Sequence, residues 1–449
     1  MSFERIRRQL SAPRLLSVIR KAFSGVGDQR ADANKKVAMA DALMSAVAMF
    51  SLKFPSLLKF DETRTEKHIR HNLHHLYGVE CAPSDSQLRD ILDPVLPSAL
   101  HPAYREVFAT IKKTTLLEEF RFLGDFLLVS VDGTGQFASS KICCPECASK
   151  TMRNGDTQYY HQLLGAVIVH PDQRQVLPLI PEPILRADGA TKNDCERNAA
   201  KRLLRRLGED EPQGPFMILE DALAANGPHL NLLKELGYSY IIGVKEGDHA
   251  QLFEAVREHE ESETMGGMTQ YDEKSGVLHI YRFVNALALN KSHPDLKVNF
   301  LEYVEIKKGE VRRRFTWITD LLITEENCVE IARGGRSRWK IENETFNTLK
   351  NQGYQLEHNY GHGKQHLATN FALLMMLAFL IDQVQELADL QFHKARQRFR
   401  SRTSLWERMR SLFVGFFITS WDTFWEAIIH GHHVPKLEPK TAIPVNNTS

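Results

Sequence analysis

The pattern of hydrophobic and polar positions divides the chain into a helical stretch, an α/β region and a second helical stretch. Apolar residues recur with a helical period from residue 2 to about residue 123. Ser84, followed by Gln87, is typical of a capping box at the start of a helix. From residue 126 onward the segment FLLVSVDG is a short aliphatic run of the kind that forms a buried strand.

Strand and helix patterns then alternate. We expect strands at 161–170, 175–184, 216–221 and 238–244, and helices at 192–207 and 229–236. This order predicts an α/β sheet with some parallel pairing. Residues 276–284, 297–307 and 310–319 alternate apolar and polar positions, which predicts antiparallel strands with one face in solvent. Helical periodicity returns at 325–390 and 405–429, and the polar, proline-containing tail from residue 430 is expected to be disordered.

Composition changes this picture little, but the distribution of charge adds to it. The chain has 449 residues, 43% hydrophobic and 25% charged, with a net charge of +1, as in an ordinary soluble protein of two or three domains. Residues 1–36 carry nine Lys/Arg and three acids, and residues 394–410 carry seven and one. Such segments suit a polyanion, although solvated helix faces would look the same.

The sequence also excludes several classes of function. Six cysteines without a secretory signal favour a reducing cytoplasm over a disulfide framework. The longest apolar run, residues 371–381, is too short to cross a bilayer and predicts a buried core helix, so no membrane role is expected. The sequence contains no phosphate-cradling glycine loop and no Ser-His-Asp order, so no nucleotide cofactor is expected.

Two aspartates stand where predicted strands end. Asp132 closes the first strand of the α/β region and Asp221 closes the fourth. Functional groups gather at the carboxyl ends of strands in a mostly parallel sheet, so these carboxylates would meet if the two strands are neighbours. The alternative for each is a turn or helix-capping residue.

A third acid would come from the helical return, which offers Glu342 and Glu344. At about 100° per residue, Trp339, Glu342 and Phe346 share one face of a helix, and Glu344 points to the opposite, solvent side. A carboxylate on the packed face is costly unless it is paired or metal-bound. A salt bridge to Arg338, four residues earlier, is the alternative for Glu342.

Three convergent carboxylates would suit hard cations. Mg²⁺ and Mn²⁺ prefer such oxygen ligands, and two ions side by side can activate a hydroxyl and stabilise a leaving oxygen in a phosphodiester. Arg338 and Lys350, which flank the predicted face, would then meet the phosphate charge.

At these residues the sequence resembles the DDE transposases of bacterial insertion sequences that carry a β-strand insertion, and ISNCY-type elements look closest. The matching segments are VSVDGTG, ILEDALAANGP, VKEGDH, WITDL and RWKIENETFNTLKNQGYQLEHNYGHG, with PSDSQLRDILD upstream. The resemblance implies a ribonuclease-H-like catalytic core. It also implies that Asp132, Asp221 and Glu342 are the catalytic ligands of two Mg²⁺ or Mn²⁺ ions.

The family's Tyr-Arg-Glu-Lys signature maps only in part. Arg338 stands four residues before Glu342, as the signature requires, but Gly335 occupies the tyrosine position and Lys350 comes one residue late. The role of Lys350 is therefore open, and Glu344 stays as an alternative third acid.

Other polar and aromatic residues have two interpretations each. Trp317 matches a tryptophan that stacks on a flipped base in related enzymes, although a strand tryptophan also suits a core. Lys245 and His249 would contact DNA phosphate or simply form a loop. Residues 358–363 (HNYGHG) form a turn after the Glu342 helix, whose role would be to reverse the chain.

The segment CCPEC contains Cys143, Cys144 and Cys147. A structural zinc ion needs four ligands, so His161 or His170 would have to complete the set. Reduced loop cysteines without a metal are the competing interpretation.

Together these features predict a DNA transposase of the bacterial cytoplasm, acting on terminal inverted repeats and target DNA as a homodimer. The alternatives are a metal-dependent nuclease without strand transfer and a domesticated, inactive DNA-binding protein. The expected divisions are a helical DNA-binding region at 1–123, a catalytic core at 124–250 and 325–430 (with the C-terminal helices), a β-strand insertion at 251–324, and a disordered tail at 431–449.

Overall fold

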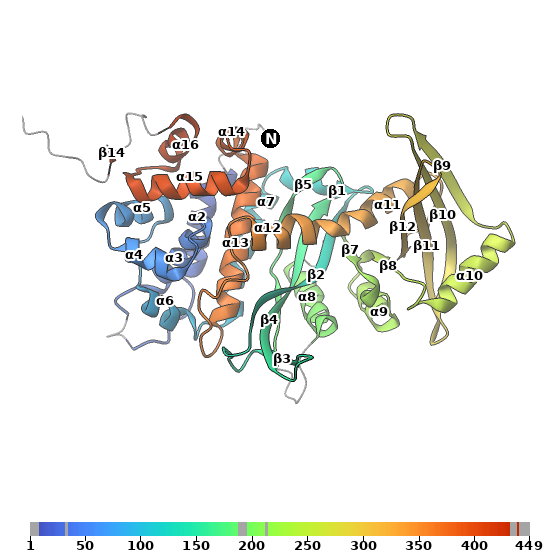
Figure 1. The fold of residues 1–449 in the computed structure, drawn as a ribbon, viewed down its shortest axis with the longest axis horizontal. Helices are drawn as coiled ribbons and strands as arrows, with labels where there is room; N and C mark the ends of the chain where they lie inside the picture. The colour runs from blue at the N-terminus through green and yellow to red at the C-terminus, as the bar shows by residue number, and fades with distance from the viewer. Residues whose placement is uncertain (1–8, 32–34, 187–194, 212–213, 432–437, 440–449) are drawn as a thin grey trace, which may run out of the picture.

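The computed structural model describes residues 9–31, 35–186, 195–211, 214–431 and 438–439. A helical body at one end, a central sheet and an antiparallel group of strands at the other end follow one another along the long axis (Figure 1).

Helices from both ends of the chain form the helical body. The N-terminal part comprises α2 (Ala12–Phe23), α3 (Met39–Ser51), α4 (Leu57–Arg64), α5 (Lys67–Tyr77), α6 (Asp85–Leu92) and α7 (His101–Lys112). The C-terminal part comprises α13 (Leu367–Ala388), α14 (Leu390–Arg398), α15 (Arg402–Gly415) and α16 (Trp421–His430). The capping box at Ser84 and Gln87 is confirmed at the start of α6.

Helix α13 is longer than the apolar run that predicts it. By length and composition it is the one helix in the described part of the chain that could cross a membrane. Its whole apolar window is buried inside the fold, where it packs against α3 and β5 (Gln173–Pro178). This burial is what a core helix requires, because every face of α13 meets protein.

The central sheet has the order β3-β4-β2-β7-β8-β12-β11-β10-β9. Strand β2 (Phe126–Ser139) pairs antiparallel with β4 (Thr157–His170) and parallel with β7 (Phe216–Glu220), which pairs parallel with β8 (Ser239–Gly243). Every residue of β7 is buried, as the apolar run Phe216–Leu219 predicts for all but its last residue, Glu220. This mixed α/β sheet confirms the predicted class and is consistent with a ribonuclease-H-like core.

Shorter strands and two helices complete this part of the molecule. They are β1 (Arg121–Phe122), β3 (Ala148–Thr151), β6 (Glu182–Ile184), α8 (Glu196–Asp210) and α9 (Gly227–Glu235).

Four antiparallel strands extend the same sheet beyond β8. They are β9 (Gly266–Asp272), β10 (Val277–Asn290), β11 (His293–Lys307) and β12 (Glu310–Thr319), and α10 (Ala250–Glu261) packs on β10. The junction is the pairing of β12 with β8, in which Trp317 lies opposite Gly243. The sequence pattern misses β9, because none of its residues is buried and they lack an apolar alternation.

The helical periodicity expected at 325–390 belongs to several segments of different helical type. Helix α11 (Cys328–Arg336) is followed by a 3-10 turn (Ser337–Trp339), a π-helical turn (Ile341–Phe346) and α12 (Asn347–Asn351). Residues 352–366 then run as a loop to α13. The chain changes its helical period where Glu342 lies, so a stripe drawn at 100° per residue does not describe this segment.

Candidate active site

Asp132 lies within β2 and not at its end, which corrects the sequence expectation. Strand β2 runs on to Ser139 because its antiparallel pairing with β4 continues past Asp132, which is opposite Gly165. The parallel pairing with β7 stops earlier, at Ser130. Asp132 therefore stands just beyond the parallel part of the sheet, where a carboxylate can emerge from its edge.

Asp221 directly follows β7, as expected, and caps the short turn after it. Its carboxylate accepts a hydrogen bond from the amide of Leu223 at 2.9 Å. Since β2 and β7 are parallel neighbours, Asp132 and Asp221 line one cavity of about 220 Å³.

Glu342 comes from the π-helical turn that crosses β4 and β2. A side chain at Gly165 would collide with the ring of Phe346, so this glycine allows the turn to approach the sheet beside Asp132. Ser130 also donates a hydrogen bond to the carbonyl of Arg338 at 2.9 Å. The π-helical geometry is found often at functional sites.

Arg338 bridges the two acids. Its Nη1 donates to Asp132 Oδ2 at 2.8 Å and its Nη2 donates to Glu342 Oε1 at 3.0 Å. Partial burial and the neighbouring Asp132 carboxyl raise the pKa of Glu342, although the Arg338 charge opposes them. The salt-bridge interpretation and the shared-site interpretation of Glu342 therefore describe the same group of side chains.

The helical stripe predicts that Glu344 faces solvent, but in the structure it pairs with two arginines instead. Its carboxylate is 24% exposed against 37% for Glu342, and it pairs with Arg174 at 3.3 Å and with Arg402 at 4.0 Å. Conversely, Trp339 was expected on the packed face but is 46% exposed. Both corrections follow from the changed period of this turn.

The sequence gives no hint of a fourth acid, Glu196, in the first turn of α8. It lines the same cavity as Asp132 and Asp221. A side chain at Gly133 would collide with its carboxylate, so the glycine after Asp132 makes room for it. Loss of hydration and the negative charges of Asp132 and Asp221 raise the pKa of Glu196.

Two cations of α8 line this cavity as well. Arg197 and Lys201 are exposed and one helical turn apart. Basic residues beside a group of carboxylates are suited to hold a phosphate that the acids alone would repel. The basic, amphipathic sequence of α8 was the available signal, but only the tertiary structure shows which side of it meets the acids.

A buried ion pair supports the end of β7. His229 Nε2 and Glu220 Oε2 are 2.5 Å apart, and both residues are less than 10% exposed. Burial works against protonation of His229, but the Glu220 charge prevails and raises its pKa. Because His229 lies in α9 and Glu220 immediately precedes Asp221, the pair holds the end of β7 to α9.

The donor set fits divalent cations of the hard type. Mg²⁺ and Mn²⁺ prefer carboxylate oxygens as ligands, which Asp132, Asp221 and Glu342 offer, and Glu196 lies beside Asp132 and Asp221. The raised pKa values of Glu342 and Glu196 reflect acids that desolvation and mutual repulsion disfavour, and a cation would relieve both. Since Arg338 engages Asp132 and Glu342, a cation at those two oxygens would compete with its guanidinium.

Among the other candidates, Lys350 pairs with Glu357 at 2.9 Å. Trp317 is 5% exposed and stacks on Phe315, with ring centroids 5.5 Å apart. Its burial agrees with the core interpretation and leaves no open face for a base.

The two candidate residues in the loop after β8 differ in their surroundings. Lys245 is exposed, whereas His249 Nε2 lies 2.9 Å from the carbonyl oxygen of Ala225. This contact ties the loop to the segment after Asp221.

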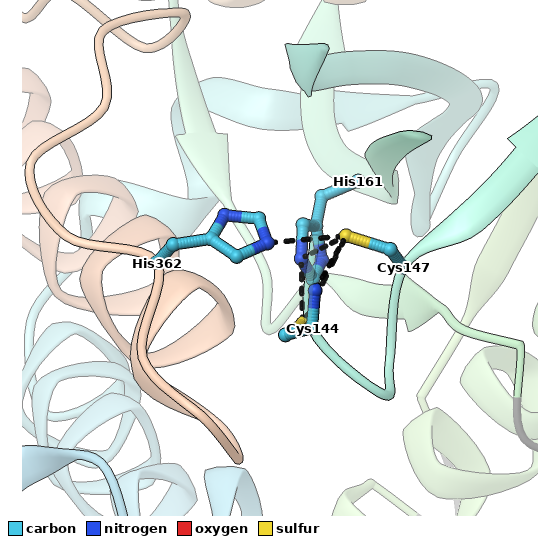
Figure 2. Close-up of side chains that lie close together, drawn as sticks. All are labelled: Cys144, Cys147, His161 and His362. Atoms are coloured by element: carbon cyan, nitrogen blue, oxygen red, sulfur yellow. Dashed lines mark hydrogen bonds between the residues drawn. The ribbon is translucent and has the colours of Figure 1, made fainter. Parts of the chain in front are cut away.

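Cys144, Cys147 and His161 come together as the sequence suggests, but their fourth neighbour is His362 (Figure 2). Cys143 is exposed and is not part of the group. His170 lies at the opposite end of β4 from His161.

A larger cavity, of about 800 Å³, lies elsewhere, between α7, α8 and the sheet. None of the three predicted acids lines it, so the charge pattern and not cavity size identifies the candidate site.

Comparison with known proteins agrees with this arrangement. No curated protein matches the chain. The family described as "Transposase DDE domain" matches residues 128–380, which include β2, β7 and the π-helical turn. On this match, which covers more than half of its length, the chain belongs to the DDE transposase family.

Proposed function

We propose that this protein is a DNA transposase that cleaves transposon ends and joins the freed 3′-hydroxyl to target DNA. The observation that carries the proposal is the bridge from Arg338 to Asp132 and Glu342, which brings together acids from a strand and a distant helical turn beside Asp221. Membership of the transposase family supports the same chemistry.

In this proposal, Asp132, Asp221 and Glu342 hold two Mg²⁺ or Mn²⁺ ions. Such ions would activate the attacking hydroxyl and stabilise the leaving oxygen. Glu196 would act as an outer carboxylate that positions these ligands, and Arg197 and Lys201 would bind the DNA backbone beside them.

The remaining parts of the proposal concern partners and origin. Residues 1–123 would bind the terminal inverted repeats, and two copies would pair the two ends of the element. The residues at 251–324 would be the β-strand insertion of an ISNCY-type bacterial element, with 124–250 and 325–430 as the two parts of the core. The protein would act on DNA in the bacterial cytoplasm.

The test uses a labelled duplex that carries the inverted repeats flanking the coding region. D132N, D221N and E342Q should each lower Mg²⁺-dependent cleavage by at least about a hundredfold while end binding persists. The matched control is E344Q, two residues from Glu342, which should cleave normally because Glu344 pairs with Arg174 and Arg402.

Undiminished cleavage by E342Q would contradict the assignment of the third acid, and loss in E344Q alone would move it to Glu344. A pre-nicked duplex separates the functions, because a nuclease would leave its 3′-hydroxyl unjoined. A chain that binds ends but never cleaves them would be the inactive DNA-binding protein.

A further inference from the structure

A second group of metal-ligating side chains lies apart from the acids. Cys144 and Cys147 lie just before β3, His161 comes from β4, and His362 comes from the loop at 352–366 (Figure 2). One ligand atom from each lies within 4.8 Å of all the others. Cys147, His161 and His362 are buried and Cys144 is half-buried.

Four of the six separations are close to those of a tetrahedral site. Cys144 Sγ lies 3.9 Å from Cys147 Sγ, and His161 Nε2 lies 3.4 Å from each sulfur. Cys147 Sγ lies 3.1 Å from His362 Nε2. Zinc–sulfur bonds of about 2.3 Å and zinc–nitrogen bonds of about 2.05 Å place tetrahedral neighbours roughly 3.3–3.8 Å apart.

The donor types select the ion. Two thiolates and two imidazoles in a tetrahedral arrangement favour zinc over the oxygen-seeking Mg²⁺ and Mn²⁺ of the acid site. Four protein ligands leave no open position for water or substrate, which is the mark of a structural site.

We propose that Cys144, Cys147, His161 and His362 form a structural zinc site. It joins the end of β4 to the loop that leads from the Glu342 turn to α13. The proposal does not depend on the proposed function, because neither the acids nor DNA takes part in it.

Contacts around the group hold this loop in position. His366 Nδ1 lies 2.5 Å from Oε1 of Glu146, which stands between the two cysteines in the sequence. Asp93, which follows α6, accepts hydrogen bonds from the amides of Lys364 and Gln365, each at 2.9 Å. The segment that directly follows His362 is therefore held in place by contacts within the protein, as a preformed site requires.

The experiment measures zinc in the full-length protein, purified without chelator under reducing conditions from cells grown with added zinc. Elemental analysis should find about one tightly held zinc per chain. C147S and H362N should lose most of it. The matched control is C143S, which should keep it because the exposed Cys143 lies outside the group.

Cobalt exchange into the unmodified chain gives a readout that does not depend on a folded variant. Tetrahedral thiolate-bound Co²⁺ should show strong visible absorption together with a sulfur-to-metal charge-transfer band, which cobalt on carboxylates lacks. Wild-type protein without zinc, equal zinc in C147S, or a Cys144–Cys147 disulfide in the purified chain would overturn the proposal. DNA cleavage is not a readout, so this test and the transposase test fail separately.

Discussion

A buried ion pair joins the N-terminal helices to the rest of the chain. Lys53, just after α3, pairs with Asp382 on α13, and their side chains are 0% and 5% exposed. The ammonium also lies 4.0 Å from the ring centroid of Trp406 on α15. Tyr354, in the loop after the Glu342 turn, donates its hydroxyl hydrogen to Asp382.

The perturbation is the removal of one charge at a time. D382N keeps the shape of the side chain but leaves the Lys53 ammonium buried without its counterion, and K53M leaves the carboxylate alone. Loss of one partner of a buried pair costs about 3–5 kcal/mol, which changes the unfolding equilibrium constant by about two to four powers of ten. The double variant K53M/D382L should lose less than either single variant, because replacing the whole pair with apolar groups removes both buried charges.

Urea unfolding, followed by tryptophan fluorescence and circular dichroism, measures these changes, and Trp406 makes the fluorescence sensitive to this contact. With D382L as the second single variant, the double-mutant cycle should give a coupling energy of about 3 kcal/mol or more. The control is K59M, which breaks an exposed pair with Glu62 and should change stability by less than about 0.5 kcal/mol. Additive losses in the double variant, or D382N losses as small as those of K59M, would refute the reasoning.

Three further predictions concern the candidate site. E196Q should raise the Mg²⁺ concentration needed for half-maximal cleavage by about 10–100-fold, and an unchanged requirement would separate Glu196 from the metal ligands. R197A and K201A should weaken binding to any duplex and lower the salt dependence of the affinity by about one counterion each, whereas a loss confined to one sequence would indicate base contacts instead. H229N should lower the free energy of unfolding most below the ordinary histidine pKa of about 6.5. The difference should shrink as pH rises through the raised pKa of His229, because the charge that Glu220 stabilises is then lost. Unfolding curves across this range measure the difference, and a loss independent of pH would contradict the prediction.

The order of strands and helices could be predicted, because each buried run is local in the sequence. Asp221 could be located for the same reason, since β7 is short and ends where its aliphatic run ends. The length of β2 could not, because its continuation past Asp132 depends on pairing with β4, a contact between distant segments.

The rest of the site depended on geometry that the sequence does not encode locally. The exposure of Glu342, Glu344 and Trp339 follows the period of the helix, which changes to a 3-10 turn at Trp339 and to a π-helical turn at the two acids. Glu196 meets the acids only because α8 begins beside β2. His362 lies 215 residues from Cys147, so no spacing motif could connect them.

The loop at 352–366 adds distant anchors to the turn that holds Glu342 against the sheet. Its start is fixed by Tyr354, which belongs to the Lys53–Asp382 network. Tyr360 donates its hydroxyl hydrogen to the carbonyl of Phe54 at 2.9 Å, and His362 reaches the cysteine group. A π-helical turn is rare in isolation; this one packs on β2, β4 and β5, and the helical body and the cysteine–histidine group add restraint to the loop that follows it. The Arg338 bridge would then stay aligned, because the loop at 352–366 is anchored at both ends by contacts far from the acids. Lys53 and Cys147 therefore influence a site that neither residue touches.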